Sequence, residues 1–187
     1  YSACKDAGIK PIIGCEVYVA HGSRFDKHGG ERSPHHLVLL ARDNTGYKNL
    51  MQLVTQAHVE GFHYRPRIDS KLLEECHQGL MAISGCPSAE VPRLLADGNT
   101  EDAARVARWY KDLFGNGYFL ELQRHEHVPN LPEINTALVD LGRQLDIPLV
   151  VTNDAHYVRQ SDSPLQDVYI CIQTNTTIND EKRLRME

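Results

Sequence analysis

The chain has 187 residues, of which 41% are hydrophobic and 24% charged, and its formal net charge is −5 at pH 7. This length and composition predict one globular domain and exclude the disordered, collagen-like and membrane-spanning classes. An acidic chain is a poor electrostatic binder of nucleic acid unless metals or a local basic patch reverse the sign of the charge.

The histidine content points to a metal site, whereas the cysteines indicate the redox setting. The cysteines at positions 4, 15, 76, 86 and 171 form no C-x-x-C pair, and their number is odd. This argues against a disulfide scaffold and a zinc finger, and it favours a reducing, cytoplasmic setting. The chain also has ten histidines, and histidine is the commonest metal ligand in proteins.

Predicted strands and helices alternate along the chain. Residues SACKDAG at the start read as the last turn of a helix. Strands are expected at Pro11–Val19, His36–Ala41, Leu80–Cys86, Tyr118–Gln123 and Leu149–Asp154. Helices are expected at Tyr47–Val59, Ala89–Ala96, from Asn99 or Thr100 to Gly115 or Gly117, around Ile134–Leu145 and at Pro164–Gln173. Short apolar strands separated by helices predict an α/β fold with a largely parallel sheet or barrel.

The segment Ala20–Pro34 is glycine-rich and longer than an ordinary connection, so it is expected to be a surface insertion. Its basic residues Arg24, Lys27 and Arg32 have two interpretations. They guide a DNA strand, or they are solvated side chains on an exposed loop.

Several polar residues fall at or just beyond the carboxyl ends of predicted strands, where α/β barrels gather functional groups. They are Glu16, Cys86, His125, Asp154 and His156. All of these except His125 have a plainer alternative when taken alone. Glu16 could sit in an ion pair or at an exposed edge, Cys86 could be an inert buried thiol, and the Asp-x-His pair could be a capping Asp and a surface His.

His36 is the first residue of its predicted strand. If that strand runs parallel to the first strand, His36 lies at the edge of the sheet opposite the carboxyl ends, away from the other candidates. If the two strands are antiparallel, His36 shares an edge with Glu16. The adjacent His35 then points to the opposite face, so only one of the two can be a ligand. His58, His63 and His77 read as surface residues. No G-x-S-x-G, phosphate-binding glycine loop or dinucleotide fingerprint supports a serine hydrolase, kinase or dehydrogenase.

Together these segments resemble a known family. The similarity covers AGIKPIIGCEVYVA, SRFDKHGGERSPHHLVLLARDNTGYKNLMQLV, EGFHYRPRID, LMAISGCPSAEVPRLL, YFLELQRH, IPLVVTNDAHY and CIQTNTTINDEKRLR. These closely resemble the PHP (polymerase and histidinol phosphatase) domain of bacterial replicative DNA polymerase III alpha subunits. The resemblance implies a distorted (β/α)7 TIM-like barrel over residues 1–187, with up to three divalent ions, zinc or manganese, at its rim.

The resemblance also assigns ligands. Glu16 matches the glutamate of the GCE segment, His36 the histidine before LVLLA, Cys86 the cysteine of SGC, and Asp154 with His156 the closing D-x-H. His125 sits near the site in this pattern without a motif that makes it a ligand. The family's opening H-x-H segment, a following Asp and a D-H segment have no counterpart here. The barrel is therefore expected to lack its first strands, and the chain to be part of a longer one.

The implied activity is metal-dependent phosphodiester hydrolysis with 3′–5′ exonuclease polarity, in a cytoplasmic DNA polymerase whose palm, fingers and thumb lie outside this chain. This segment alone is expected to be inactive. The implied partners are a DNA primer end, the rest of the alpha subunit, a sliding clamp and an exonuclease subunit. Two alternatives remain open: a non-catalytic scaffold that docks the polymerase core and the exonuclease subunit, and a stand-alone phosphatase of small phosphate monoesters.

Overall fold

The computed structural model describes residues 1–27, 33–125 and 128–184. The chain divides into two compact units, Tyr1–Thr152 and Asn153–Glu187. The strands of the first unit are β1 (Gly14–Val19), β2 (His35–Ala41), β3 (Arg67–Ile68), β4 (Leu80–Ile83), β5 (Tyr118–Gln123) and β6 (Leu149–Thr152). Its helices are α1 (Ser2–Asp6), α2 (Asn44–Val59), α3 (Ser70–Cys76), α4 (Glu90–Ala96), α5 (Thr100–Phe114), the 3₁₀ turn η1 (Gly115–Gly117) and α6 (Leu131–Leu145).

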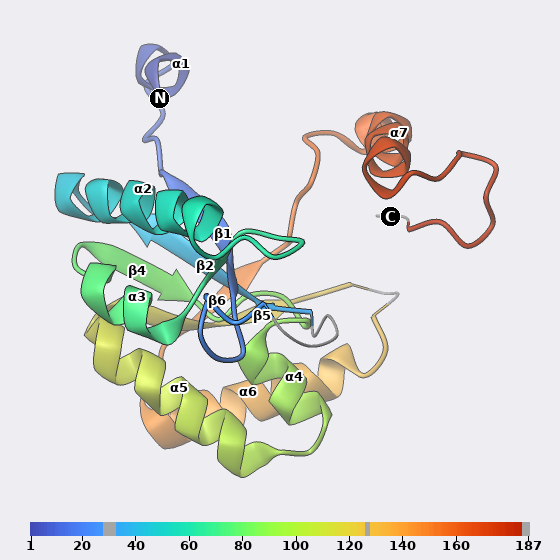
Figure 1. The fold of residues 1–187 in the computed structure, drawn as a ribbon. Helices are drawn as coiled ribbons and strands as arrows, with labels where there is room; N and C mark the ends of the chain where they lie inside the picture. Colours follow the sequence, from blue (N-terminus) through green and yellow to red (C-terminus); the bar gives the residue numbers. More distant parts are fainter. Residues whose placement is uncertain (28–32, 126–127, 185–187) are drawn as a thin grey trace. The chain divides into compact units, whose positions relative to one another are not determined.

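The described strands form one open sheet in the order β3-β1-β2-β4-β5-β6 (Figure 1). The β1–β2 and β2–β4 pairs are antiparallel, whereas β1–β3, β4–β5 and β5–β6 are parallel. Among these strands β2 alone therefore runs against the others, and the prediction of a largely parallel α/β sheet is confirmed. The carboxyl ends of the parallel strands and the start of β2 consequently lie at one edge of the sheet.

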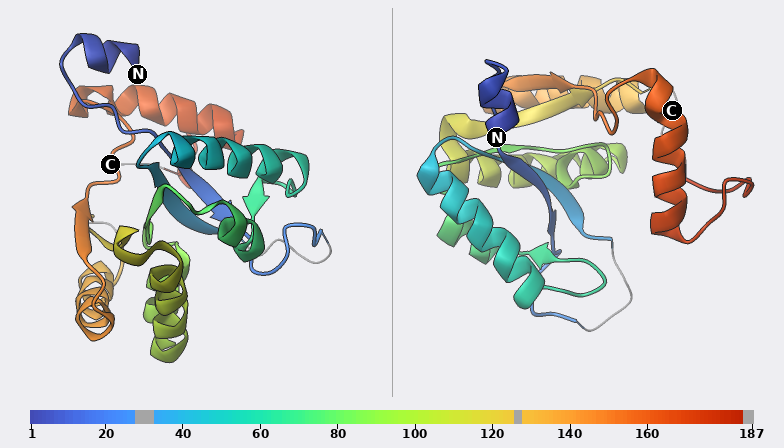
Figure 2. Two further views of the ribbon diagram at one scale, coloured as in Figure 1. Left: turned by 90° about the vertical axis from the view of Figure 1, so that its left-hand side faces the viewer. Right: turned by 90° about the horizontal axis from the view of Figure 1, so that it is seen from above.

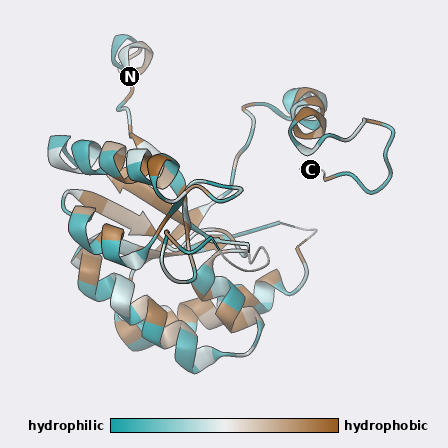
Figure 3. Ribbon diagram, viewed as in Figure 1, coloured by the Kyte–Doolittle hydropathy of each residue, from teal (hydrophilic) through white to brown (hydrophobic). Residues whose placement is uncertain are grey.

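Side chains alternate between the two faces of a strand. Along β1 and β2 the buried side chains alternate with more exposed ones, so one face of the sheet carries the core. Helix α2 packs against β1, β2, β3 and β4 (Figure 2), and α3 packs against α2. Helix α5 packs against β4 and β5 and α6 against β5, while α4 packs against α5 and α6. The strands are mostly brown and the outward turns of α2 and α5 mostly teal in Figure 3, as expected of helices with one apolar stripe. The most deeply buried core side chains are Leu39, Leu53, Ile68, Leu72, Leu73, Ala82, Ala103, Ala107, Tyr118 and Leu120.

Helix α2 begins where its sequence provides a cap and a close approach. The Asp43 carboxylate accepts a hydrogen bond from the Gly46 N–H at 2.8 Å, which satisfies one of the free donors of the first turn. A side-chain carbon on Gly46 would overlap the carbonyl oxygen of Gly79, in the turn before β4. The absence of a side chain at Gly46 therefore lets α2 lie directly on that turn.

Replacing Gly46 by alanine is expected to destabilise the first unit by about 2–3 kcal/mol, since helix and turn must move apart. Alanine is a better helix former than glycine, so propensity alone predicts the opposite sign. Hydrogen exchange of the α2 and β4 amides measures the effect. Slower exchange in Gly46→Ala would show that the close approach does not matter.

Sequence reasoning missed β3 and α3. Strand β3 has two residues, too few for an alternating pattern, and its bounds come from pairing with β1. Helix α3 begins at an Asp69 cap, whose side chain accepts from the Leu72 N–H. The predicted strands at 80–86 and 149–154 end earlier in the structure, at Ile83 and Thr152, because loops that carry polar residues begin there. The predicted strand at 11–19 begins later, at Gly14.

The second unit contains the 3₁₀ turn η2 (Gln160–Asp162) and α7 (Ser163–Thr174). An ion pair of 2.7 Å between Arg183 and Asp167 ties the segment after α7 back to that helix. Across the described residues, no helix has both the length and the apolar character needed to cross a bilayer.

Candidate functional site

Three of the predicted ligands lie together at the edge where the parallel strands end. Glu16 and Tyr18 alternate with the buried Val17 and Val19 of β1, so they lie on the face opposite the core. The antiparallel register pairs Tyr18 with His36 at the start of β2. Because β1 and β2 are antiparallel, His36 lies at the same edge of the sheet as Glu16.

His36 is the centre of this cluster. Its Nδ1 lies 3.2 Å from Glu16 Oε1 and 3.5 Å from Cys86 Sγ. The side chains of Glu16 and His36 are 43% and 26% exposed, so both remain accessible to a ligand. A carboxylate, an imidazole and a thiol thus meet around a single ring nitrogen.

Cys86 reaches this position through the turn that follows β4. Gly85 has φ +88°, and a side-chain carbon there would press on Ala89 and on the carbonyl group of His36. The neighbouring Ser84 is buried, and its hydroxyl oxygen accepts from the Glu121 N–H at 2.9 Å, which fixes the turn to β5. The SGC sequence therefore folds Cys86 back toward β2, which an extended strand to residue 86 would not do.

The spacing of these donors can be compared with that of metal ligands. Around a tetrahedral zinc ion, Zn–N and Zn–O distances of about 2.0–2.1 Å and a Zn–S distance of about 2.3 Å place neighbouring donors about 3.3–3.6 Å apart. The His36–Cys86 distance of 3.5 Å falls in this range, and the Glu16–His36 distance of 3.2 Å lies just below it. Within the described ranges, however, no group of three or more His, Cys, Asp and Glu side chains is arranged to hold a metal ion outright. The cluster supplies two suitable donor pairs, and its chemistry fits a divalent cation.

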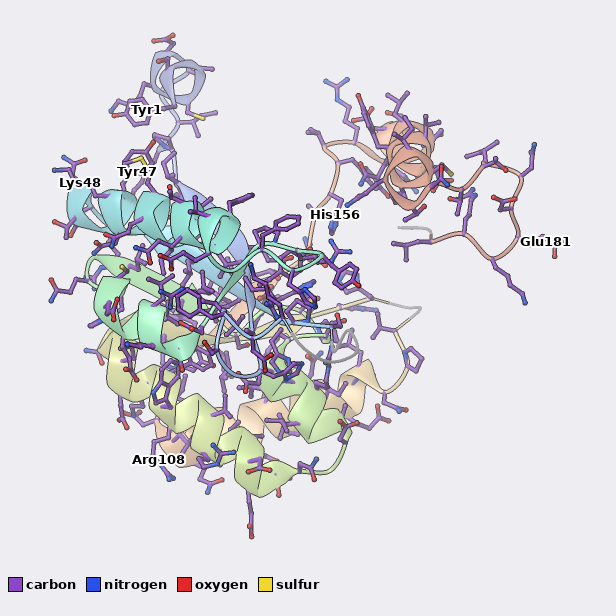
Figure 4. The ribbon with its side chains drawn as sticks, in the orientation of Figure 1. Tyr1, Tyr47, Lys48, Arg108, His156 and Glu181 are labelled. Carbon is purple, nitrogen blue, oxygen red and sulfur yellow. The ribbon has the colours of Figure 1, made fainter. Side chains whose placement is uncertain are left out.

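Asp154 and His156 belong to the second unit and lie close to each other. His156, on the segment that leads into α7 (Figure 4), places Nδ1 2.7 Å from the Asp154 carbonyl oxygen and 3.9 Å from its carboxylate. Because a carbonyl only accepts, Nδ1 of the neutral ring carries the proton and Nε2 the lone pair. Metal-binding histidines commonly donate their other N–H in this way. Asp154 has φ +47°, a backbone conformation that residues other than glycine rarely adopt.

The other histidines have separate surroundings. His35 is 7% exposed on the core face, and burial, followed by the charges of His21 and Arg93, lowers its pKa to about 4. The prediction that His35 and His36 face opposite ways is confirmed. His125 follows β5, and its Nε2 is buried with no hydrogen-bond partner among the described residues. His58 is exposed, whereas His63 and His77 are half-buried.

The interpretations of Arg24 as a DNA guide or a solvated side chain are both wrong. Arg24 is 8% exposed and forms ion pairs with Asp69 at 2.9 Å and Glu60 at 2.7 Å. Burial alone lowers the pKa of Arg24, but the hydrogen bonds and charges of these carboxylates outweigh it and raise that pKa. Lys27 is exposed, and Arg32 lies outside the described residues.

Two residues that sequence reasoning did not single out adjoin the cluster. The Tyr18 ring meets the His36 ring edge to face at 5.1 Å between centroids, and the Tyr18 hydroxyl accepts a hydrogen bond from Arg65 at 3.1 Å. Tyr18 could have been found, because it follows Glu16 by two positions in a strand and shares its face. Arg65 could not, since the pairing of β3 with β1 brings it there.

Comparison with known proteins shows one family. The PHP domain family matches residues 1–125. The chain is 44% identical to the DNA polymerase III subunit alpha of Borreliella burgdorferi over 189 residues, and 44% identical to that of Treponema pallidum over 187 residues. These alignments cover 100% and 98% of this chain. For the Thermus aquaticus subunit the identity is 42% over 190 residues, covering 99% of this chain.

The chain spans only 15–16% of the length of these three relatives. The matched residues 1–125 contain β1, β2, β4 and β5, and with them Glu16, His36 and Cys86. The chain belongs to the PHP domain family.

Proposed function

We propose that this chain is part of a bacterial replicative DNA polymerase III alpha subunit, and that residues 1–187 form a PHP domain that hydrolyses phosphodiester bonds with bound divalent ions. The ligands in this proposal are Glu16, His36, Cys86, Asp154 and His156. The observation that carries it is the convergence of Glu16 and Cys86 on Nδ1 of His36. The similarity to alpha subunits along the whole chain supports the parent enzyme.

The donor set suits zinc or manganese. Glu16 and Asp154 offer hard carboxylate oxygens, whereas His36, His156 and Cys86 offer softer nitrogen and sulfur donors that favour zinc. Divalent ions at such a site would activate a water molecule and neutralise charge on the attacking and leaving oxygens. Their positive charge would also offset the acidity of the chain where a phosphate must approach.

The residues of the chain have separate tasks in this hydrolysis. Glu16 places a carboxylate oxygen 3.2 Å from Nδ1 of His36, so that both atoms could face one ion, and Gly85 fixes the position of Cys86. The Asp154 carbonyl orients His156 so that Nε2 is available. The proposed substrate is the 3′ end of a primer strand, and the proposed partners are the rest of the alpha subunit, a sliding clamp and an exonuclease subunit, all in the cytoplasm.

A scaffold that docks the polymerase core, with structural metals or none, is the first alternative. A phosphatase of small monoesters is the second, and the similarity to polymerase subunits over the entire chain argues against it. Elemental analysis and digestion of single-stranded DNA by the full-length protein separate these possibilities.

The experiment uses Asp154→Ala and His156→Ala in the full-length protein. Each variant is expected to lose at least one of two or three bound ions, and with it the digestion of single-stranded DNA from the 3′ end. A wild-type metal content near zero would overturn the catalytic proposal. Digestion that persists in Asp154→Ala would assign the activity to another part of the protein.

A further inference from the structure

A tight turn before β3 holds an arginine beside the cluster of Glu16, His36 and Cys86. The His63 N–H donates to the Arg65 carbonyl oxygen at 3.0 Å, and Tyr64 between them has φ +60°. A non-glycine residue in this conformation is strained, and such strain persists where the surrounding structure imposes it. The turn leads directly into β3, which pairs with β1 at Tyr18.

The Arg65 guanidinium is held by Tyr18. Its Nη1 donates to the Tyr18 hydroxyl at 3.1 Å, and its Cζ lies 5.2 Å from the centroid of the same ring. That ring in turn contacts His36 edge to face. The contacts therefore run without interruption from Arg65 through Tyr18 to the imidazole that Glu16 and Cys86 approach.

Arg65 differs from the arginines that pair with carboxylates. Arg24 is neutralised by Asp69 and Glu60, and Arg105 by Asp102. Arg65 is exposed, and no carboxylate pairs with it in the part of the chain that the structure describes. A guanidinium has five N–H donors in a planar fork that matches the oxygens of a phosphate. Most of these donors remain available to a ligand.

We propose that Arg65, held by Tyr18, binds a phosphate oxygen of the nucleic-acid strand that is hydrolysed at the cluster. This inference rests on the proposed function and adds a positioning residue for its substrate. Arg65 supplies positive charge from the protein itself, next to donors that would be occupied by metal. The strained turn is the device that fixes this charge where a phosphodiester must lie.

Arginine-specific modification by phenylglyoxal, read residue by residue with mass spectrometry, tests the proposal without relying on activity. The full-length protein is treated with and without single-stranded oligothymidylate. The oligonucleotide is expected to slow modification of Arg65 about tenfold, the protection that one occupied charge-assisted contact gives. Arg108 on the outward face of α5 (Figure 4) is the internal control and keeps its rate. Equal rates at Arg65 with and without oligonucleotide overturn the proposal.

Kinetics of the same protein separate this inference from the proposed function. Arg65→Ala is expected to raise KM for oligothymidylate about tenfold with a smaller change in kcat, while the metal content stays that of the wild type. Arg65→Lys recovers part of the effect, because lysine keeps the charge without the fork. Arg108→Ala changes neither constant. If the oligonucleotide protects Arg65 but the protein does not hydrolyse it, the proposed function is contradicted and the phosphate contact of Arg65 is not. If the protein hydrolyses the oligonucleotide and Arg65→Ala leaves KM unchanged, the phosphate contact of Arg65 is contradicted.

Discussion

His36→Ala in the full-length protein is expected to lose at least one bound divalent ion and to digest single-stranded DNA at least about 100-fold more slowly. The effect is large because Glu16 and Cys86 both approach the same nitrogen of His36. Removing this ring takes away the donor that both other side chains approach. Elemental analysis and initial digestion rates at fixed metal concentration measure the two effects.

His58→Ala is the matched control, since His58 is exposed on α2 and its Nδ1 bonds to the carbonyl oxygen of Val54 in its own helix. It should keep both the metal content and the rate. If His36→Ala also keeps both, the cluster does not bind the catalytic ions. A variant that loses rate but keeps all its metal would assign His36 a role in substrate contact instead.

The second large effect is expected at Arg24. Arg24→Ala removes the cation that faces Asp69, a carboxylate that is 4% exposed, and leaves that charge buried without this cation. Breaking a buried ion pair costs about 3–5 kcal/mol, and we expect the lower figure because backbone N–H groups still bind Asp69. Hydrogen exchange of the β3 and α3 amides reports the loss. Lys27→Ala, a change at an exposed residue nearby, should leave this exchange unaltered.

The same pair predicts a pH dependence. Burial raises the pKa of Asp69, but hydrogen bonds from the backbone of Arg24 and Leu72, together with the charge of Arg24, outweigh it and hold this pKa below 3.8. A folded-state pKa below the unfolded value means that the stabilisation is present at neutral pH and lost as the pH falls through the folded pKa. In Arg24→Ala this loss below about pH 4 should shrink. An unchanged acid profile would show that Arg24 does not set the pKa of Asp69.

Most of the fold could be predicted because its elements carry local signals. Helix α2 has a cap at Asp43, and β5 is a short, largely apolar run directly after the glycine turn Gly115–Gly117. Each signal depends on residues within one or two turns of the chain. Strand β3 has no such signal, because its two residues become a strand only by pairing with β1.

Only part of the cluster of Glu16, His36 and Cys86 could be predicted from the sequence. The antiparallel direction of β2 decides whether His36 lies beside Glu16, and sequence alone gives both directions as alternatives. The surroundings of Arg24 could not be predicted from the sequence. An arginine in a glycine-rich segment reads as solvated, and only the fold brings Asp69 and Glu60 to it across the first unit. The contact of Arg65 with Tyr18 has the same long-range origin.

The most direct test of the metal proposal is anomalous X-ray diffraction from crystals of the full-length protein, collected at the zinc and manganese absorption edges. We expect an anomalous peak about 2.0–2.3 Å from His36 Nδ1 and Cys86 Sγ, with Glu16 in the same shell, and with Asp154 and His156 as ligands of the same group of ions. A protein that digests single-stranded DNA and shows no peak beside His36 would contradict this proposal.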